Sequence, residues 1–366
     1  MATENKSKSG RIRAVLIFCM LSLLLVITLP LVPYVIDAYA TDADNVETSS
    51  IISVPNPAIN LWNDVRQRHD QISGISQVKS VDSGVLINKA GEDWRRFRIE
   101  MLVPYGAIFM VAILGAIVVF HLFRGKQLMP GGRTGIRIPR MTLYQRTAHW
   151  FTAGLFWLLA ITGLILLYGR FVLIPILGAD GFSVTAAACK EVHNLFGPLF
   201  LLAVVTMFIL YIKGNLYKLE DLKWMAKGGG MFGGHVSAGR YNFGEKTWFW
   251  LVIVFGLSLS LSGLVLDFAI FGQGREVMAV SHMVHGISAL ILISVSFGHI
   301  YLGTVGVEGT LDSMSTGTVD AAWAKAHHDQ WYEEMTAAGE LIDTDVSSDD
   351  ADVTRVGGVV NADTRT

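Results

Sequence analysis

Four histidines lie at the ends of long apolar runs in this 366-residue chain: His149, His193, His285 and His299. Ionisable side chains are costly inside a membrane, so each of them indicates a function. His285 and His299 are fourteen residues apart, so on one helix they would share roughly one face and lie about 21 Å apart along its axis. Neutral imidazole is a common metal ligand. The spacing therefore predicts ligands at two depths of one membrane-spanning helix.

The composition is that of a membrane protein. Hydrophobic residues make up 52% of the chain and charged residues 16%, against roughly 25% charged residues in an ordinary soluble domain. The two cysteines, Cys19 and Cys189, lie in no C-x-x-C or C-x-x-C-H arrangement. This cysteine pattern argues against a disulfide scaffold, a zinc site, an iron–sulfur cluster and covalently attached c-type haem.

Six apolar stretches are each long enough to cross a bilayer as a helix. They cover residues 14–36, 101–122, 147–169, 192–212, 247–266 and 277–307. The first stretch follows a basic segment and ends near Ala38-Tyr39-Ala40, which is typical of a signal peptidase site. We therefore expect a cleaved signal peptide at residues 1–40, and a retained N-terminal anchor is the alternative.

Basic residues set the orientation of these helices. The loop after the second stretch has six and no acidic residue: Arg124, Lys126, Arg133, Arg137, Arg140 and Arg146. The loop after the fourth also has six: Lys213, Lys218, Lys223, Lys227, Arg240 and Lys246. Short basic loops stay in the cytoplasm, so the third and fifth helices run outward and the fourth and sixth run inward. The fold class is therefore an all-α membrane protein, a four-helix up-down bundle preceded by one further transmembrane helix.

This orientation places the histidines at two depths. His193 and His285 lie at the outer ends of their helices, whereas His149 and His299 lie at the inner ends. A separation of about 20 Å excludes one metal site with four histidines, because metal–nitrogen bonds are about 2 Å long. Two axial nitrogens from two helices, at each of two depths, are what a pair of b-type haems needs.

Some nearby residues have more than one interpretation. His282 competes with His285, but it lies about 100° away around the helix from the inner histidine, so we predict His285 as the ligand. His121 is expected to be an interfacial residue. Arg146 has two possible roles: it could bind a haem propionate, or it could serve only as one of the basic residues that set the topology.

The organisation that follows has six parts. They are a signal peptide or N-terminal anchor (1–40), an external, periplasmic segment (41–100), a transmembrane helix (101–123), a di-haem cytochrome b domain (142–310), a cytoplasmic helical segment (311–339) and a disordered acidic tail (340–366). Such a multi-pass chain is expected in the inner (plasma) membrane of a bacterium.

Several segments together resemble a known family. "QRTAHW", "EVHNLFGP", "SHMVHG" and "FGHIYLG", with the loop "GRYNFGEKTWFW" and the late "AAWAKAHHDQWYEE", resemble the cytochrome b (gamma) subunit of membrane-bound formate dehydrogenase over residues 142–334. The related cytochrome b subunit of nickel–iron hydrogenases is the second possibility. A haem-free membrane anchor or transporter is the third, although the sequence shows neither the repeated halves nor the mid-membrane helix breaks of many transporters.

The resemblance implies two haem b groups on the four histidines and a role in electron transfer. It implies a quinone site near the inner haem, in the loop that contains Asn242, Gly244 and Glu245, although an asparagine helix cap explains the same loop. The partners would be an iron–sulfur (beta) subunit and a catalytic molybdenum or tungsten (alpha) subunit, because this chain has no site for formate oxidation. His327 and His328 receive no role.

Overall fold

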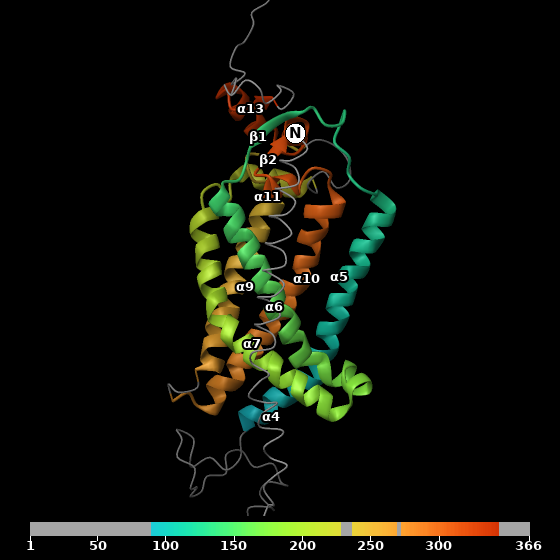
Figure 1. Cartoon of the computed structure of the whole chain (residues 1–366), viewed down its shortest axis with the longest axis vertical. Coiled ribbons are helices and arrows are strands. Elements are labelled where there is room, and N and C mark those ends of the chain that lie inside the picture. The colour runs from blue at the N-terminus through green and yellow to red at the C-terminus, as the bar shows by residue number, and fades with distance from the viewer. Residues whose placement is uncertain (1–88, 228–235, 269–271, 344–366) are drawn as a thin grey trace, which may run out of the picture. The chain divides into compact units, whose positions relative to one another are not determined.

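The computed structural model describes residues 89–227, 236–268 and 272–343 (Figure 1). The predicted signal peptide or anchor (1–40), residues 41–88 of the predicted external segment and residues 344–366 of the predicted tail lie outside this part. Within it, five helices are long and apolar enough to cross a membrane: Gly91–Arg124, Leu143–Val172, Ile174–Tyr211, Phe243–Asp267 and Arg275–Gly306. They correspond to the last five of the six apolar stretches.

The first of these spans is a composite of three elements, α4 (Lys89–Arg96), the π-helical turn η2 (Phe97–Leu102) and α5 (Val103–Arg124). The others are α6 (Leu143–Val172), α7 (Ile174–Tyr211), α9 (Phe243–Asp267) and α10 (Arg275–Tyr301), and α10 continues into the π-helical turn η5 (Leu302–Gly306). The short helix α8 (Leu219–Ala226) lies between α7 and α9 in the sequence.

Helix α7 begins well before the stretch predicted at 192–212, so most of the chain between the stretches at 147–169 and 192–212 is helical. The run Ala186-Ala187-Ala188 favours helix, because alanine has the highest helix propensity. The break lies instead at Gly178, whose φ of 73° is a conformation that glycine adopts readily. The non-helical backbone of this glycine makes a kink that separates two helices, which together form α7.

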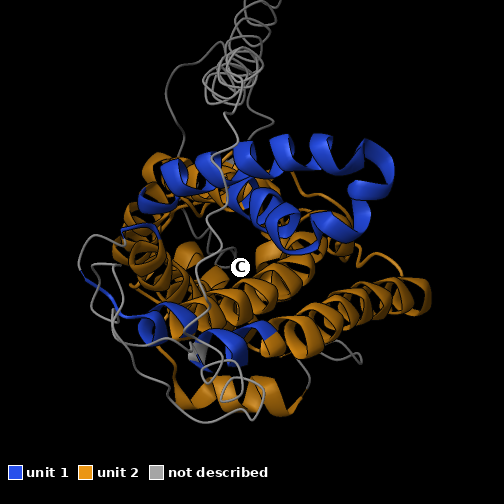
Figure 2. Cartoon of the chain, turned by 90° about the horizontal axis from the view of Figure 1, so that it is seen from below, with its two compact units in different colours: residues 1–95, 157–198, 267–279 blue, residues 96–156, 199–266, 280–366 orange. Residues whose placement is uncertain are grey.

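The chain divides into two compact units (Figure 2). Among the described residues, unit 1 contains those within 89–95, 157–198 and 267–279, and unit 2 contains those within 96–156, 199–266 and 280–343. In unit 1, α6 and α7 pack closely, since a Cβ added at Gly169 would lie 2.7 Å from the Phe182 ring. Glycine at 169 thus permits this helix contact.

In unit 2, α7 packs against both α6 and α9. The Tyr211 hydroxyl of α7 donates a hydrogen bond of 2.9 Å to the backbone oxygen of Gln145 on α6. A Cβ at Gly256 on α9 would lie 2.9 Å from the Val204 side chain of α7, so the close approach of these helices requires glycine.

The helix α5 packs on α10, also within unit 2. Leu102, which precedes α5, lies over Gly286, where an added Cβ would be 2.7 Å from the leucine side chain. Further along, His121 Nδ1 and the Tyr301 hydroxyl are 3.0 Å apart. His121 is thus part of a hydrogen-bonded contact between helices, consistent with its expected structural place at the end of α5.

A small β-sheet in unit 2 makes the all-α prediction incomplete. The strand β1 (Ile136–Pro139) lies between β2 (Thr318–Asp320) and β3 (Ile342–Asp343), antiparallel to both. The chain after α10 also forms the short helices α11 (Asp312–Ser315), α12 (Ala321–His327) and α13 (Asp329–Ala337). We call β1 together with residues 307–343 the cap. The predicted disorder from residue 340 is wrong for β3, which pairs with β1.

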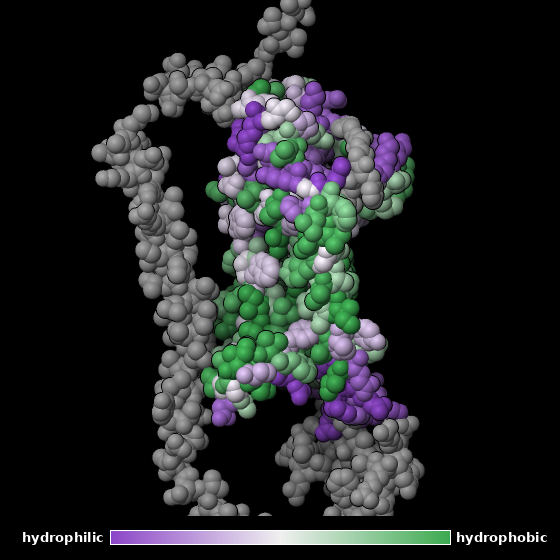
Figure 3. All heavy atoms as spheres, turned by 90° about the vertical axis from the view of Figure 1, so that its right-hand side faces the viewer, coloured by the Kyte–Doolittle hydropathy of each residue, from purple (hydrophilic) through white to green (hydrophobic). Residues whose placement is uncertain are grey.

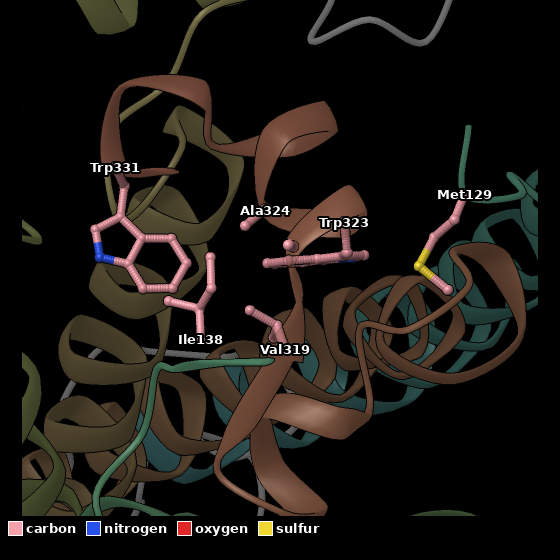
Figure 4. Close-up of a cluster of buried hydrophobic side chains, with 7 residues drawn as sticks. Met129, Ile138, Val319, Trp323, Ala324 and Trp331 are labelled. Carbon is pink, nitrogen blue, oxygen red and sulfur yellow. The ribbon is translucent and has the colours of Figure 1, made fainter. Parts of the chain in front are cut away.

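The cap has its own hydrophobic core (Figure 4). Ile138 and Val319, from the two paired strands, are fully buried and lie close to Trp323 and Trp331. The sequence gives no periodic signal here, because strands of three or four residues are too short to show alternation. In Figure 3, hydrophilic residues gather over the cap and hydrophobic residues cover the helices below it.

Candidate functional site

The predicted inner histidines lie together in unit 2. The ring centroids of His149 on α6 and His299 on α10 are 6.2 Å apart. Two imidazoles on opposite sides of one metal ion, with metal–nitrogen bonds of about 2 Å, place their centroids roughly 6 Å apart. The Nδ1 atom of His149 is buried and has no hydrogen-bond partner among the described residues. The spacing fits a metal-centred group between the two rings, and the unpartnered Nδ1 leaves His149 without the second hydrogen bond that orients many metal-binding histidines.

The His299 ring is also fixed from its other side. It stacks on the indole of Trp248 of α9, with 4.5 Å between centroids and 13° between the planes. Three helices, α6, α9 and α10, therefore meet around this pair of histidines. Aromatic stacking restricts rotation of the imidazole without using a ring nitrogen.

His193, in unit 1, has a defined tautomer. Its Nδ1 lies 2.9 Å from the hydroxyl of Thr162 on α6, and that hydroxyl also lies 2.9 Å from the carbonyl oxygen of Leu158. A carbonyl can only accept, and the hydroxyl has a single proton, which it donates to Leu158. His193 must then donate from Nδ1, and the lone pair is on Nε2. This is the form in which a histidine binds a metal through Nε2.

His285, in unit 2, is held in the same way. Its Nδ1 lies 3.1 Å from the Ser262 hydroxyl of α9 and 3.0 Å from the carbonyl oxygen of Leu259. The serine hydroxyl donates to the carbonyl oxygen of Ser258. Both neighbours of Nδ1 therefore act as acceptors, so the proton is on Nδ1 and the lone pair on Nε2. His282, the rival candidate, is exposed.

Each of these hydroxyls is followed by a glycine that makes room for the histidine. A Cβ at Gly163 would lie 3.2 Å from Cε1 of His193, and a Cβ at Gly263 would lie 3.2 Å from Cε1 of His285. A side chain at either position would press on the imidazole. The hydroxyl–glycine pair thus occurs once in each unit and supports one histidine in each.

Helices α6 and α9 share a second feature, the capping box with which each begins. At α6, the Gln145 N–H donates to Thr142 Oγ1 and the Thr142 N–H to Gln145 Oε1. At α9, the Glu245 N–H donates to Asn242 Oδ1 at 3.0 Å and the Asn242 N–H to Glu245 Oε2 at 3.1 Å. The sequence shows no repeat here, because these positions match in chemical role and not in residue identity.

The loop predicted to line a quinone site therefore contains a helix cap, as the alternative interpretation stated. Gly244 lies in the first turn of α9, and a Cβ there would be 3.4 Å from the Trp224 indole. A cavity of about 150 Å³ lies nearby, and its lining includes Asp221, Trp224, Tyr241 and Lys246. The predicted residues Asn242, Gly244 and Glu245 are not in that lining.

Glu245 belongs to a buried ionic cluster that includes the cap. Arg140, a residue that is 3% exposed, donates from its guanidinium to Glu245 Oε1 at 2.9 Å and lies 3.3 Å from His328 Nε2. Its central carbon lies 4.7 Å from the centre of the Trp323 ring, a cation–π contact. Arg140 thus joins the start of α9 to the cap.

His328 is fully buried in this cluster. Burial lowers the pKa of His328 to about 4, so the ring is neutral at pH 7. It donates from Nδ1 to the carbonyl oxygen of Gly239 at 2.8 Å, which leaves Nε2 to accept from Arg140. Sequence reasoning missed both residues. Arg140 was counted as a topology marker, and the only signal for His328 was its place in the tryptophan-rich segment after the bundle.

Arg146 also contacts the cap. It donates to the backbone oxygen of Ser315 at 2.7 Å, and its Nε atom is buried without a hydrogen-bond partner in the described part of the chain. The unsatisfied Nε–H agrees with the predicted role beside an anionic group, while the bond to Ser315 holds the arginine in place.

Comparison with known proteins adds a family to this geometry. The profile of the family described as prokaryotic cytochrome b561 matches residues 140–317. The chain is 33% identical over 208 residues to the formate dehydrogenase cytochrome b556(fdo) subunit of Escherichia coli K12, covering 56% of this chain and 95% of that relative. It is 26% identical over 207 residues to the nitrate-inducible cytochrome b556(Fdn) subunit of the same organism, covering 55% and 93%.

A third relative, the formate dehydrogenase cytochrome b556 subunit of Haemophilus influenzae, is 27% identical over 205 residues, covering 54% of this chain and 83% of the relative. The profile match includes all four candidate histidines and both hydroxyl–glycine pairs. These relatives favour formate dehydrogenase over hydrogenase and confirm the resemblance found in the motifs. The chain belongs to the family of formate dehydrogenase cytochrome b subunits.

Proposed function

We propose that this chain is the membrane subunit through which a formate dehydrogenase passes electrons to a quinone. Formate would be oxidised on a catalytic (alpha) subunit, and an iron–sulfur (beta) subunit would deliver the electrons. Bound haem b would supply the one-electron carriers. The observation that carries the proposal is the 6.2 Å spacing of the His149 and His299 rings, in a chain whose relatives are cytochrome b556 subunits.

Four histidines would hold two haem groups. His149 and His299 would hold the inner one, at the end of the bundle that contacts the cap. His193 and His285 would hold the outer one, and the tautomer assigned to each supports ligation through Nε2. Arg146 would bind a propionate of the inner haem with its Nε–H, which lacks a hydrogen-bond partner among the described residues.

We propose that quinone is reduced at the inner end, next to the loop that begins α9. The roles of the three loop residues differ. Asn242 caps the helix through Oδ1, so only its amide NH₂ would face a ligand. Gly244 leaves space beside the Trp224 indole. Glu245 is bound by Arg140, so its part would be to fix the loop.

The proposed direction of electron flow is inward across the bacterial inner membrane. Moving one electron against the membrane potential stores about 2.3 kcal/mol per 100 mV. The predicted topology, with basic loops and the cap in the cytoplasm, would take quinone protons from that side. Formate oxidation outside would then be coupled to charge separation.

Haem analysis of single-histidine variants tests this function. We expect about two b-type haems per chain in the complex purified with its partner subunits, by pyridine haemochrome absorbance. His149→Ala and His299→Ala should each remove the same haem, and His193→Ala and His285→Ala the other. His282→Ala, on the same helix as His285 but exposed, is the matched control and should retain both.

Two outcomes would contradict the proposal. A well-folded complex without haem would leave a membrane anchor as the function. Haems that are reduced by hydrogen and remain oxidised with formate would make the partner a hydrogenase.

A further inference from the structure

We propose that Thr162 and Ser262 tune the outer haem to a lower reduction potential than the inner haem. They would act as positioning residues through the histidines that they contact. The inference rests on the proposed function, since it needs both haems to be present. It comes from a difference between the two predicted pairs of histidines in the hydrogen bonds that their rings make.

Both outer histidines donate from Nδ1 to a fixed acceptor. The acceptors are Thr162 Oγ1, at 2.9 Å, and the Leu159 backbone for His193, and Ser262 Oγ with the Leu259 carbonyl for His285, at 3.1 and 3.0 Å. Neither inner histidine has such a bond to another described residue. The Nδ1 atom of His149 is buried and unpartnered, and His299 is held by stacking on Trp248.

This difference acts on the metal through the ring. An N–H that donates to a strong acceptor shifts electron density into the imidazole, so the opposite nitrogen becomes a better electron donor to iron. A better donor stabilises the ferric state relative to the ferrous state and lowers the reduction potential. One electron would pass from ferrous iron held by His193 and His285 to ferric iron held by His149 and His299, and no bond would form or break. The potential difference would favour that transfer.

Ordinary helix chemistry explains a part of the arrangement. Serine and threonine hydroxyls often donate to a carbonyl of the preceding turn. Thr152, Thr185, Ser258 and Ser260 do so here, each to a carbonyl of its own helix. Thr162 and Ser262 differ from these residues in two ways. Each hydroxyl also contacts the Nδ1 atom of a histidine, and each residue is followed directly by a glycine. The same combination occurs independently in unit 1 and in unit 2.

Redox titration of two hydroxyl variants tests the inference. Thr162→Val and Ser262→Ala, made in the intact complex, should raise the potential of the outer haem. At a fixed applied potential, its ratio of reduced to oxidised form should rise roughly two- to ten-fold, the effect of one hydrogen bond. The inner haem and the haem content should not change. The readout is the α-band absorbance during potentiometric titration, with the low-temperature electron paramagnetic resonance signals of the ferric haems.

Conservative and matched variants separate tuning from packing. Thr162→Ser keeps the hydroxyl and should keep the wild-type potential. Thr185→Val and Ser260→Ala remove buried or half-buried hydroxyls that bond only their own helix, and both should leave the two potentials unchanged. If valine at position 162 prevents haem insertion, Ser262→Ala and Thr162→Ser still decide the question.

Two results would overturn the inference. Unchanged potentials in Thr162→Val and Ser262→Ala, with both haems bound, would mean that the hydroxyls do not tune the iron. Equal shifts of both haems would mean a general change of packing. A wild-type complex that binds no haem would instead refute the proposed function, so the two failures are distinguishable.

Discussion

The outer and inner histidines are held by two kinds of contact. His193 and His285 are held by groups on a helix of their own unit, at sequence separations of 31 and 23 residues. The inner end of unit 2 depends on the cap. Arg140 contacts Glu245 and His328, at sequence separations of 105 and 188 residues, and Arg146 contacts Ser315, at a separation of 169 residues. The first arrangement follows from the packing of helix pairs, and the second requires a distant segment to fold. Damage to the cap should therefore affect only the inner pair.

The largest effect is expected from Arg140→Ala. The substitution leaves Glu245 without its cation and removes the contact with the Trp323 ring, which should destabilise unit 2 by about 3 kcal/mol. This loss of stability is at the low end of the range for breaking a buried ion pair, because the Glu245 side chain is 32% exposed. Thermal unfolding followed by tryptophan fluorescence measures the loss. Haem analysis should find the inner haem reduced in amount and the outer haem retained.

A surface ion pair provides the control for Arg140. Arg133 pairs with Asp312 at 2.9 Å, but its side chain is 48% exposed, so Arg133→Ala should cost less than about 1 kcal/mol. Equal loss of both haems in Arg140→Ala would contradict the comparison between the two ends.

The stability of the cap should fall in acid because of His328. Its folded-state pKa of about 4 lies below the value of about 6.5 expected in the unfolded chain. Between these values the unfolded state binds more protons, so the stabilising contribution is complete above pH 6.5 and decreases as the pH falls toward 4. The total loss is about 3 kcal/mol.

Unfolding curves measured from pH 7 to pH 4 check this dependence. The His328→Gln variant should be less stable than the wild type at pH 7, and its free energy of unfolding should decrease much less between pH 7 and pH 4. The His327→Gln variant, changed at the neighbouring position, should show the same decrease as the wild type. A wild-type protein with constant stability over this range would show that His328 does not titrate as its burial requires.

An alanine at Gly163 or Gly263 should disturb the outer haem alone. The added Cβ would lie 3.2 Å from the histidine ring in each case, so the imidazole must move by a few tenths of an ångström. We expect a loss of about 1–3 kcal/mol and weaker binding of the outer haem, measured by haem content. Gly154→Ala and Gly298→Ala are matched controls, because an added Cβ at either has no neighbour within 4 Å. Normal haem binding by both test variants would show that these glycines serve packing only.

Sequence reasoning succeeded where a feature has a period or a local motif. Apolar runs predicted five helices that are long enough to span a membrane, and the predicted depth paired His149 with His299, which lie together. It failed where distant residues meet. Arg137 of β1 is paired with Asp320 of β2, so neither strand has a partner nearby in the sequence, and the sheet of the cap was missed. The helices α11, α12 and α13 lie within the helical segment predicted at 311–339. The same distance concealed the contact of Arg140 with His328.

The smallest effect is expected from Trp248, which stacks on His299. Trp248→Leu removes an aromatic contact worth about 1 kcal/mol and frees the imidazole to rotate about its axis. Ring orientation of axial ligands affects the electron paramagnetic resonance of ferric haem, so the inner signal should shift while the haem content stays normal. Trp248→Phe keeps an aromatic ring at this position and should shift it less. A change in the outer signal would mean that this tryptophan couples the two haems, and the inner and outer histidines would then no longer be independent of each other.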